Sequence, residues 1–129
     1  MSASPNFAAT PVAGGANVSA TASASYTTPT NTSTLLTAGA NGTMVQEIVA
    51  VGTGVTVAGM LNFFLLDSSA AYHFWDSFVV PVVTPSATTA PFRLVRDYQN
   101  LWLPAGWSLV VASWVAAQLV HVTAMGLNA

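Results

Sequence analysis

The residues best suited to catalysis lie in one short segment. His73, Asp76 and Ser77 have the side chains of a base, an orienting acid and a nucleophile. His73 and Asp76 are too close along one predicted strand for the freedom that a catalytic triad needs, and no G-x-S-x-G sequence accompanies Ser77. The segment therefore indicates a strand with aromatic side chains in the core and polar ones at its rim. We expect a protein that is not an enzyme.

Ligand spacing for a metal ion or a cofactor is also missing from the sequence. The chain has no cysteine, its two histidines lie far apart, and its four carboxylates are isolated. Gly52-Thr53-Gly54 has neither the third glycine nor the helix of a phosphate-binding loop. We expect no cofactor and no metal site. One alternative stays open, an ion on a three-fold axis that each subunit ligates once through Asp or His.

Charged side chains are rare in these 129 residues. They make up 5% of the chain, whereas apolar residues make up 53%, and a typical soluble domain has about 25% charged residues. The only cations are Arg93 and Arg96, too few for binding nucleic acid through its phosphates. We expect one of these arginines to pair with a carboxylate at a sheet edge, the alternative being an acidic patch on a partner. A surface so poor in charge favours association with other subunits.

Short apolar segments alternate with turn residues from Thr34 onward, at the spacing typical of a sandwich or barrel. We predict an all-β fold, an antiparallel β-sandwich that is jelly-roll-like and has about eight strands in two sheets. The predicted strands are 33–38, 43–52, 55–66, 71–83, 90–97, 100–103, 107–114 and 118–126.

Two of these strands allow a prediction of which residues share a face. Along 44–51, alternation puts Met44 and Ile48 on one face and Val45 and Val49 on the other. Neither face is cleanly polar, so we expect both to be covered. Along 118–123, the alternation places Leu119, His121 and Thr123 opposite Val120 and Val122.

An N-terminal arm is expected to precede this domain. Residues 1–32 are mostly Ala, Ser and Thr, and cannot form a core with their few sizeable apolar side chains, Phe7, Val12, Val18 and Tyr26. We therefore divide the chain into an extended arm at 1–32 and a sandwich domain at 33–129. The arm should lie across a neighbouring subunit, with those four residues in contact with it. The sandwich should then fold without residues 2–30.

A membrane-spanning helix is the main alternative for the C-terminal segment. Trp107 to Leu127 is nearly uncharged and about as long as a spanning helix. However, polar residues occur throughout it, many of its apolar residues are β-branched, and no cluster of Lys or Arg lies beside it. We predict two strands here and no membrane partner.

Three turn-rich motifs occur in an informative order. They are Thr37-Ala38-Gly39-Ala40-Asn41-Gly42, Val83-Thr84-Pro85-Ser86-Ala87-Thr88 and Leu103-Pro104-Ala105-Gly106-Trp107-Ser108-Leu109. With these motifs, residues 30–112 resemble small virion structural proteins of tailed bacteriophages and prophages. The resemblance implies a capsid decoration, or cement, protein on the surface of the virion. It also implies two partners, the major capsid protein and further copies of the chain, in a trimer where three capsid subunits meet.

Aromatic residues keep other binding functions open. We expect Trp75, Trp102 and Trp107 to anchor protein contacts, because tryptophan brings a large amphipathic area into an interface. The same rings could instead stack on sugars. The alternatives are therefore a phage tail, neck or fibre component with host-glycan binding, and a secreted carbohydrate-binding sandwich.

Overall fold

Eight strands form the structure, a computed structural model that describes residues 10–129, with Asn100 described only by its place in a strand. No helix occurs in this range, and every strand pairing is antiparallel. The strands are β1 (Thr10–Asn17), β2 (Ser33–Thr37), β3 (Thr43–Gly52), β4 (Gly59–Leu66), β5 (Tyr72–Val80), β6 (Arg93–Leu103), β7 (Ser108–Ser113) and β8 (Val120–Asn128). The predicted all-β, antiparallel fold is confirmed.

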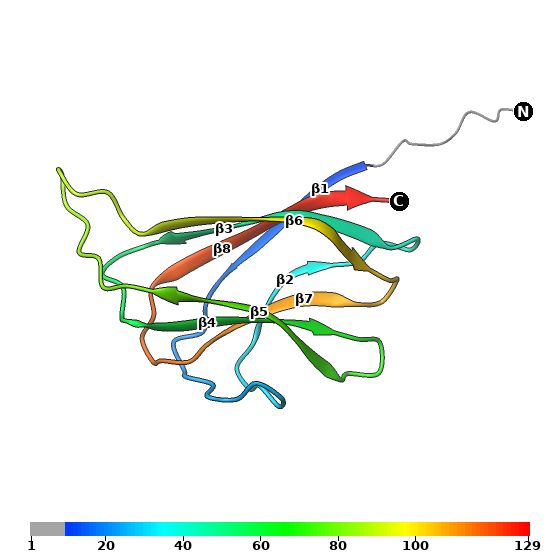
Figure 1. Cartoon of the computed structure of the whole chain (residues 1–129), viewed down its shortest axis with the longest axis horizontal. Coiled ribbons are helices and arrows are strands. Elements are labelled where there is room, and N and C mark those ends of the chain that lie inside the picture. Colours follow the sequence, from blue (N-terminus) through cyan, green and yellow to red (C-terminus); the bar gives the residue numbers. More distant parts are fainter. Residues whose placement is uncertain (1–9) are drawn as a thin grey trace, which may run out of the picture.

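Two four-stranded sheets lie face to face within the described residues (Figure 1). Sheet A has the strand order β1-β8-β3-β6, and sheet B has the order β2-β7-β4-β5. Four of the strand pairings are those of one long hairpin that has folded over on itself, namely β1·β8, β2·β7, β3·β6 and β4·β5. The result is the β-sandwich that the turn spacing predicts.

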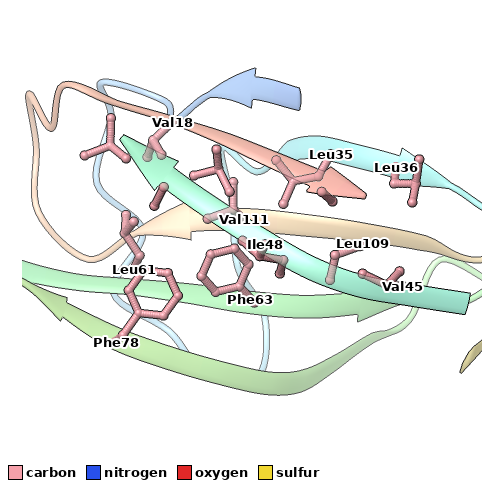
Figure 2. Close-up of a cluster of buried hydrophobic side chains, with 14 of the residues drawn as sticks. Val18, Leu35, Leu36, Val45, Ile48, Leu61, Phe63, Phe78, Leu109 and Val111 are labelled. Carbon is pink, nitrogen blue, oxygen red and sulfur yellow. The ribbon is translucent and has the colours of Figure 1, made fainter. Parts of the chain in front are cut away.

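Inward-facing side chains of both sheets form one core (Figure 2). Val45 and Ile48 of β3 are fully buried on the sheet A side, as are Leu61 and Phe63 of β4 on the sheet B side. The ring of Phe63 lies 4.9 Å from that of Phe78 on β5. Fully burying an aliphatic or Phe side chain contributes about 1.5–3 kcal/mol, so this layer is what holds the two sheets together.

Strand β4 has an unbroken apolar run because both of its faces are buried. Leu61, Phe63 and Leu65 belong to the core between the sheets, whereas Phe64 packs with Val110 of β7 on the outer face of sheet B. An antiparallel sheet with one wet face normally alternates apolar and polar residues. The outer face of sheet B is therefore a second packing surface.

The segment between β1 and β2, residues 18–32, reaches this outer side of sheet B and is here called the strap (Figure 1). The ring of Tyr26 lies 4.8 Å from the ring of Phe74 on β5 and 4.8 Å from that of Trp114. Phe74 in turn lies 5.5 Å from the buried ring of Phe64. The strap therefore adds aromatic cover to the outer face of its own sheet B.

The N-terminal boundary of the sandwich differs from the predicted one. Thr10–Asn17 forms β1, which pairs with β8 along its whole length, and Val18 is buried in the core. Gly14 permits the approach of β1 to β2, because a Cβ there would collide with the carbonyl oxygen of Leu35. Residues 10–32 thus belong to the sandwich and not to a separate arm, and a deletion of 2–30 would remove a whole strand. The composition of residues 10–17 did not indicate a strand, because β1 packs through close backbone approach and not through large side chains.

Two of the other differences from prediction come from irregular pairing in sheet A, whereas the predicted strands 55–66 and 71–83 are present in shorter form as β4 and β5. The predicted strands 90–97 and 100–103 are one strand, β6, whose pairing with β3 is irregular between Asp97 and Leu101. In β3 the register with β8 shifts between Val45 and Glu47, so that Gln46 is an extra residue in this pairing. Such a bulge moves the following residues to the opposite face. Val45 is therefore buried on the same side as Ile48, and not on the opposite side as strict alternation predicts.

The C-terminal segment forms strands. No helix within residues 10–129 is long and apolar enough to cross a membrane. Residues from Trp107 to Leu127 contain β7 and most of β8. In β8 the predicted alternation is confirmed, because Val120 and Val122 are buried while His121 and Thr123 are partly exposed.

Candidate interaction surface

The three residues considered for catalysis do not converge on one site. His73 Nε2 lies 2.9 Å from Asp67 Oδ2, and the His73 ring stacks on Trp107 with centroids 5.4 Å apart. Hydrogen bonds from the backbone N–H of Ala71 and from His73 hold the pKa of Asp67 below its ordinary value. These contacts close the turn between β4 and β5.

Asp76 instead bridges the two sheets on the side where β5 and β6 are the edge strands. Its Oδ2 accepts a hydrogen bond from the Tyr98 hydroxyl at 2.8 Å and lies 3.4 Å from Arg96 Nη1. Its Oδ1 accepts the backbone N–H of Ser77 at 2.8 Å. Burial, together with the Asp76 carboxylate, raises the pKa of Tyr98. The predicted pairing of one arginine with a carboxylate at a sheet edge is confirmed for Arg96.

Several residues predicted to contact a partner are occupied within the fold. Val18 belongs to the core, and Val12 and Trp107 pack against it in partly buried positions. Phe7 lies outside the described residues. The first three side chains therefore stabilise the sandwich itself.

The remaining predicted contact residues are exposed but lie on different parts of the molecule. Tyr26, Trp75 and Trp102 each expose 43–44% of their surface. Tyr26 lies in the strap, and Trp75 is the extra residue of a bulge in edge strand β5. Trp102 lies on the outer face of sheet A, against the turn at Gly42. These three residues therefore do not form a single aromatic platform.

The outer face of sheet A is not covered by any described residue. Its residues form four rows across the strands: Pro11-Leu127-Met44-Trp102, Ala13-Met125-Glu47-Asp97, Gly15-Thr123-Val49-Val95 and Asn17-His121-Val51-Arg93. None of these sixteen residues is buried. On the outer face of sheet B, by contrast, Phe64, Val110 and Ala112 are all buried. The two outer faces thus differ in cover, although both are rich in apolar residues.

The charges on this face are unbalanced. Glu47 and Asp97 are register partners on neighbouring strands, and neither forms an ion pair within the described part of the chain. Like charges in directly opposite positions destabilise a sheet. Arg93 lies on the same face, beside Val51 at the other end of β6. A cation supplied from outside the described residues would relieve the repulsion between the two carboxylates.

Sequence reasoning missed this face as a surface. It predicted that both faces of β3 are covered, whereas Met44, Val49 and Val51 are only partly buried. The lack of polar residues at these positions indicates an apolar surface. No feature of the sequence indicates that the strap covers sheet B and not sheet A.

Neither a group of metal ligands nor a pocket adds a further site in the described residues. No group of three or more His, Asp or Glu side chains that could hold a metal ion occurs within residues 10–129, and no pocket is found there. The chain matches no protein-family model and no curated protein. The resemblance to phage virion proteins therefore stays an expectation that is drawn from three sequence motifs.

Proposed function

We propose that this chain is a non-enzymatic virion structural protein, a decoration or cement protein that binds the outer surface of a phage head. The attachment surface is the outer face of sheet A. The observation that carries the proposal is the difference in cover: the strap lies on sheet B, whereas no described residue covers sheet A. A contiguous exposed apolar surface of this kind is typical of a protein interaction site.

Strand connectivity supports the same class of protein. The pairs β1·β8, β2·β7, β3·β6 and β4·β5 occur in sheets of order 1-8-3-6 and 2-7-4-5. We propose that this arrangement is a jelly roll, an architecture found in viral capsid and lectin domains. A fold does not determine a function by itself. Attachment is therefore inferred from the uncovered face of sheet A.

Attachment would depend mainly on apolar contact. Burial of apolar surface contributes about 25 cal/mol per Å², whereas an exposed ion pair contributes about 0–1 kcal/mol. A lysine or arginine of the capsid protein beside Glu47 and Asp97 would add specificity by relieving their repulsion. Many weak contacts become effective when each copy touches two or more capsid subunits, because the second contact forms at high effective concentration.

A charge placed on sheet A tests the attachment surface. Val95 of edge strand β6 is exposed in the row that contains Val49 and Thr123. We expect Val95→Glu to weaken binding to heads that lack the protein by at least about tenfold in co-sedimentation. Thr34→Glu, at an exposed position in edge strand β2 of sheet B, is the matched control and should bind normally. Equal binding of both variants would contradict the assignment of this face.

The dependence of binding on ionic strength provides a second test of the same attachment surface. Salt at about 1 M screens charges beyond roughly 3 Å, but it does not weaken apolar burial. The protein should therefore stay on the particle through a salt titration and leave it in urea or on heating. Release at moderate salt would show that the charged residues carry the interface.

Glycan binding is the second candidate function, and one observation favours it. Tyr26 and Phe74 are both about half exposed, with ring centroids 4.8 Å apart on the outer side of sheet B. Such rings offer apolar faces to a sugar. Titration with host cell-wall glycans, followed by the fluorescence of the adjacent Trp114, tests this candidate. A saturable change would support a tail, fibre or carbohydrate-binding role.

A further inference from the structure

Strand β6 lies at the edge of sheet A, and within the described residues it pairs with β3 alone (Figure 1). The pairing is regular from Arg93 to Asp97. The backbone N–H of Gly52 donates to the carbonyl oxygen of Phe92 at 2.7 Å, so the backbone groups of Phe92 point toward β3. Because these groups alternate in direction along an antiparallel strand, those of Arg93, Val95 and Asp97 point away from β3. This edge therefore offers backbone donors and acceptors to another strand.

The same three residues form a symmetric pattern of charge on the outer face of sheet A. Val95 lies midway between Arg93 and Asp97, and all three side chains are exposed. Neither charged side chain forms an ion pair within the described part of the chain. Four residues of extended strand separate their Cα atoms by about 13 Å. The strand thus holds opposite charges apart in one copy and can present both of them to another.

We propose that β6 pairs antiparallel with β6 of a second copy, about a two-fold axis at Val95. In this register Val95 lies opposite its own equivalent, and Arg93 of each copy lies opposite Asp97 of the other. All three pairs bring together backbone groups that point away from β3, so each pair can form hydrogen bonds across the axis. The contact is isologous, because each copy contributes the same strand. It would join two copies of sheet A into one continuous sheet.

Charge distinguishes this register from the neighbouring ones. Registers that bring the same backbone groups together differ by steps of two residues. A shift of two residues places Arg93 or Asp97 opposite Val95, and a shift of four places Arg93 or Asp97 opposite its own equivalent. Opposite charges in directly opposite positions stabilise a sheet, whereas like charges destabilise it. The register centred on Val95 is therefore the one in which both charges of each strand find a partner.

The other edge strands are less suited to such a contact. In β5 the pairing with β4 is interrupted by a bulge at Trp75, and bulges disfavour the addition of a strand to an edge. In β1 the backbone at Gly14 lies against Leu35 of β2. An unrelated strand could use the backbone groups of β6, but β6 itself supplies both charges at the required spacing. Self-complementarity therefore favours a second copy as the partner.

The same contact would relieve the repulsion between Glu47 and Asp97. The row Ala13-Met125-Glu47-Asp97 would continue into Arg93 of the second copy. One cation beside two carboxylates leaves a net negative charge, so a cation of a capsid protein can still bind there. The outer faces of the two joined sheets stay open. The inference is therefore compatible with the proposed attachment and does not depend on it.

The test is the oligomeric state of the full chain in the absence of any particle. Sedimentation equilibrium over about a hundredfold range of concentration should show a reversible equilibrium between monomer and dimer. Arg93→Glu sets two carboxylates opposite each other at both ends of the contact, and it should raise the dissociation constant at least about tenfold. Adding Asp97→Arg to the same chain restores opposite charges in each pair and should recover the association.

A control and a second readout separate this contact from general effects. Thr123→Glu adds a carboxylate to the same face in β8, away from the β6 edge, and should leave the dimer unchanged. Circular dichroism would verify that every variant keeps the strand spectrum. Hydrogen exchange of the Val95 amide should become slower as the dimer forms, whereas the Leu94 amide, which points toward β3, should be protected at every concentration.

Three results would overturn the inference. The first is a wild-type protein that stays monomeric, or that forms trimers and no dimers. The second is an Arg93→Glu variant that associates as tightly as the wild type, or an exchange of both charges that does not recover association. The third is exchange of the Val95 amide that does not depend on concentration. Because no particle is present, these results do not bear on attachment, and Thr123→Glu changes the attachment face without changing the dimer contact.

Discussion

Replacing Asn62 by leucine should stabilise the protein. Asn62 of β4 is fully buried, and neither Oδ1 nor Nδ2 has a hydrogen-bond partner within the described residues. Its register neighbours on the two adjacent strands are Ser77 and Ala112, and it alternates with the core residues Leu61 and Phe63. Asn62 therefore belongs to the apolar outer face of sheet B. A buried polar group without a partner costs about 1–3 kcal/mol.

Leucine has the same number of side-chain heavy atoms as asparagine and no polar atom to satisfy. We expect Asn62→Leu to raise the free energy of unfolding by about 1–3 kcal/mol, measured by urea denaturation with an unchanged slope. Thermal unfolding should shift upward by about 3–5 °C for each kcal/mol in a chain of this size. Asn62→Ala is the control, because it removes the same amide but leaves a cavity that offsets the gain.

A leucine variant that is less stable than the wild type would refute this reasoning. It would mean that the amide of Asn62 is hydrogen-bonded in solution and that the outer face of sheet B is wetter than its burial indicates. In that case Asn62→Ala should also be clearly destabilised, because both variants would lose the same bonds.

Two further substitutions test contacts that cross between elements. Gln118→Ala should lower the free energy of unfolding by about 1–3 kcal/mol, because both backbone groups of Val57 lose their partner, and hydrogen exchange of the Val57 amide should become faster. Tyr98→Phe should cost about 1 kcal/mol through the lost bond to Asp76. Because folding raises the Tyr98 pKa, its contribution is present below about pH 10 and is lost as the pH rises further; alkaline denaturation of the phenylalanine variant should lack that component.

The strands were predictable where local chemistry decides them. Turn residues such as Asn41-Gly42 and Pro104-Ala105-Gly106 separate apolar segments, and β2 and β3 lie where this spacing places them. The unbroken run of β4 indicated burial on both faces. The bulge at Gln46 left no such mark, because Gln46 is an extra residue only in the pairing of β3 with the distant strand β8.

Tertiary contacts decided what the sequence could not reveal. β1 contains two glycines and two alanines, a composition typical of disorder, yet Gly14 is what allows it to lie against β2. The composition of the strap is that of a polar linker, and only the structure shows that Tyr26 packs against Phe74 and Trp114. The uncovered face of sheet A follows from the path of the strap, so no local pattern could have located it.

A density map of the intact particle would show directly whether the outer face of sheet A is the attachment surface. We expect copies of this chain on the outside of the head, with Thr123, Val49 and Val95 of sheet A against the capsid protein. A lysine or arginine of that protein should lie beside Glu47 and Asp97. A map in which this face points into solvent, or in which the head carries no copy of the chain, would rule out the proposed attachment.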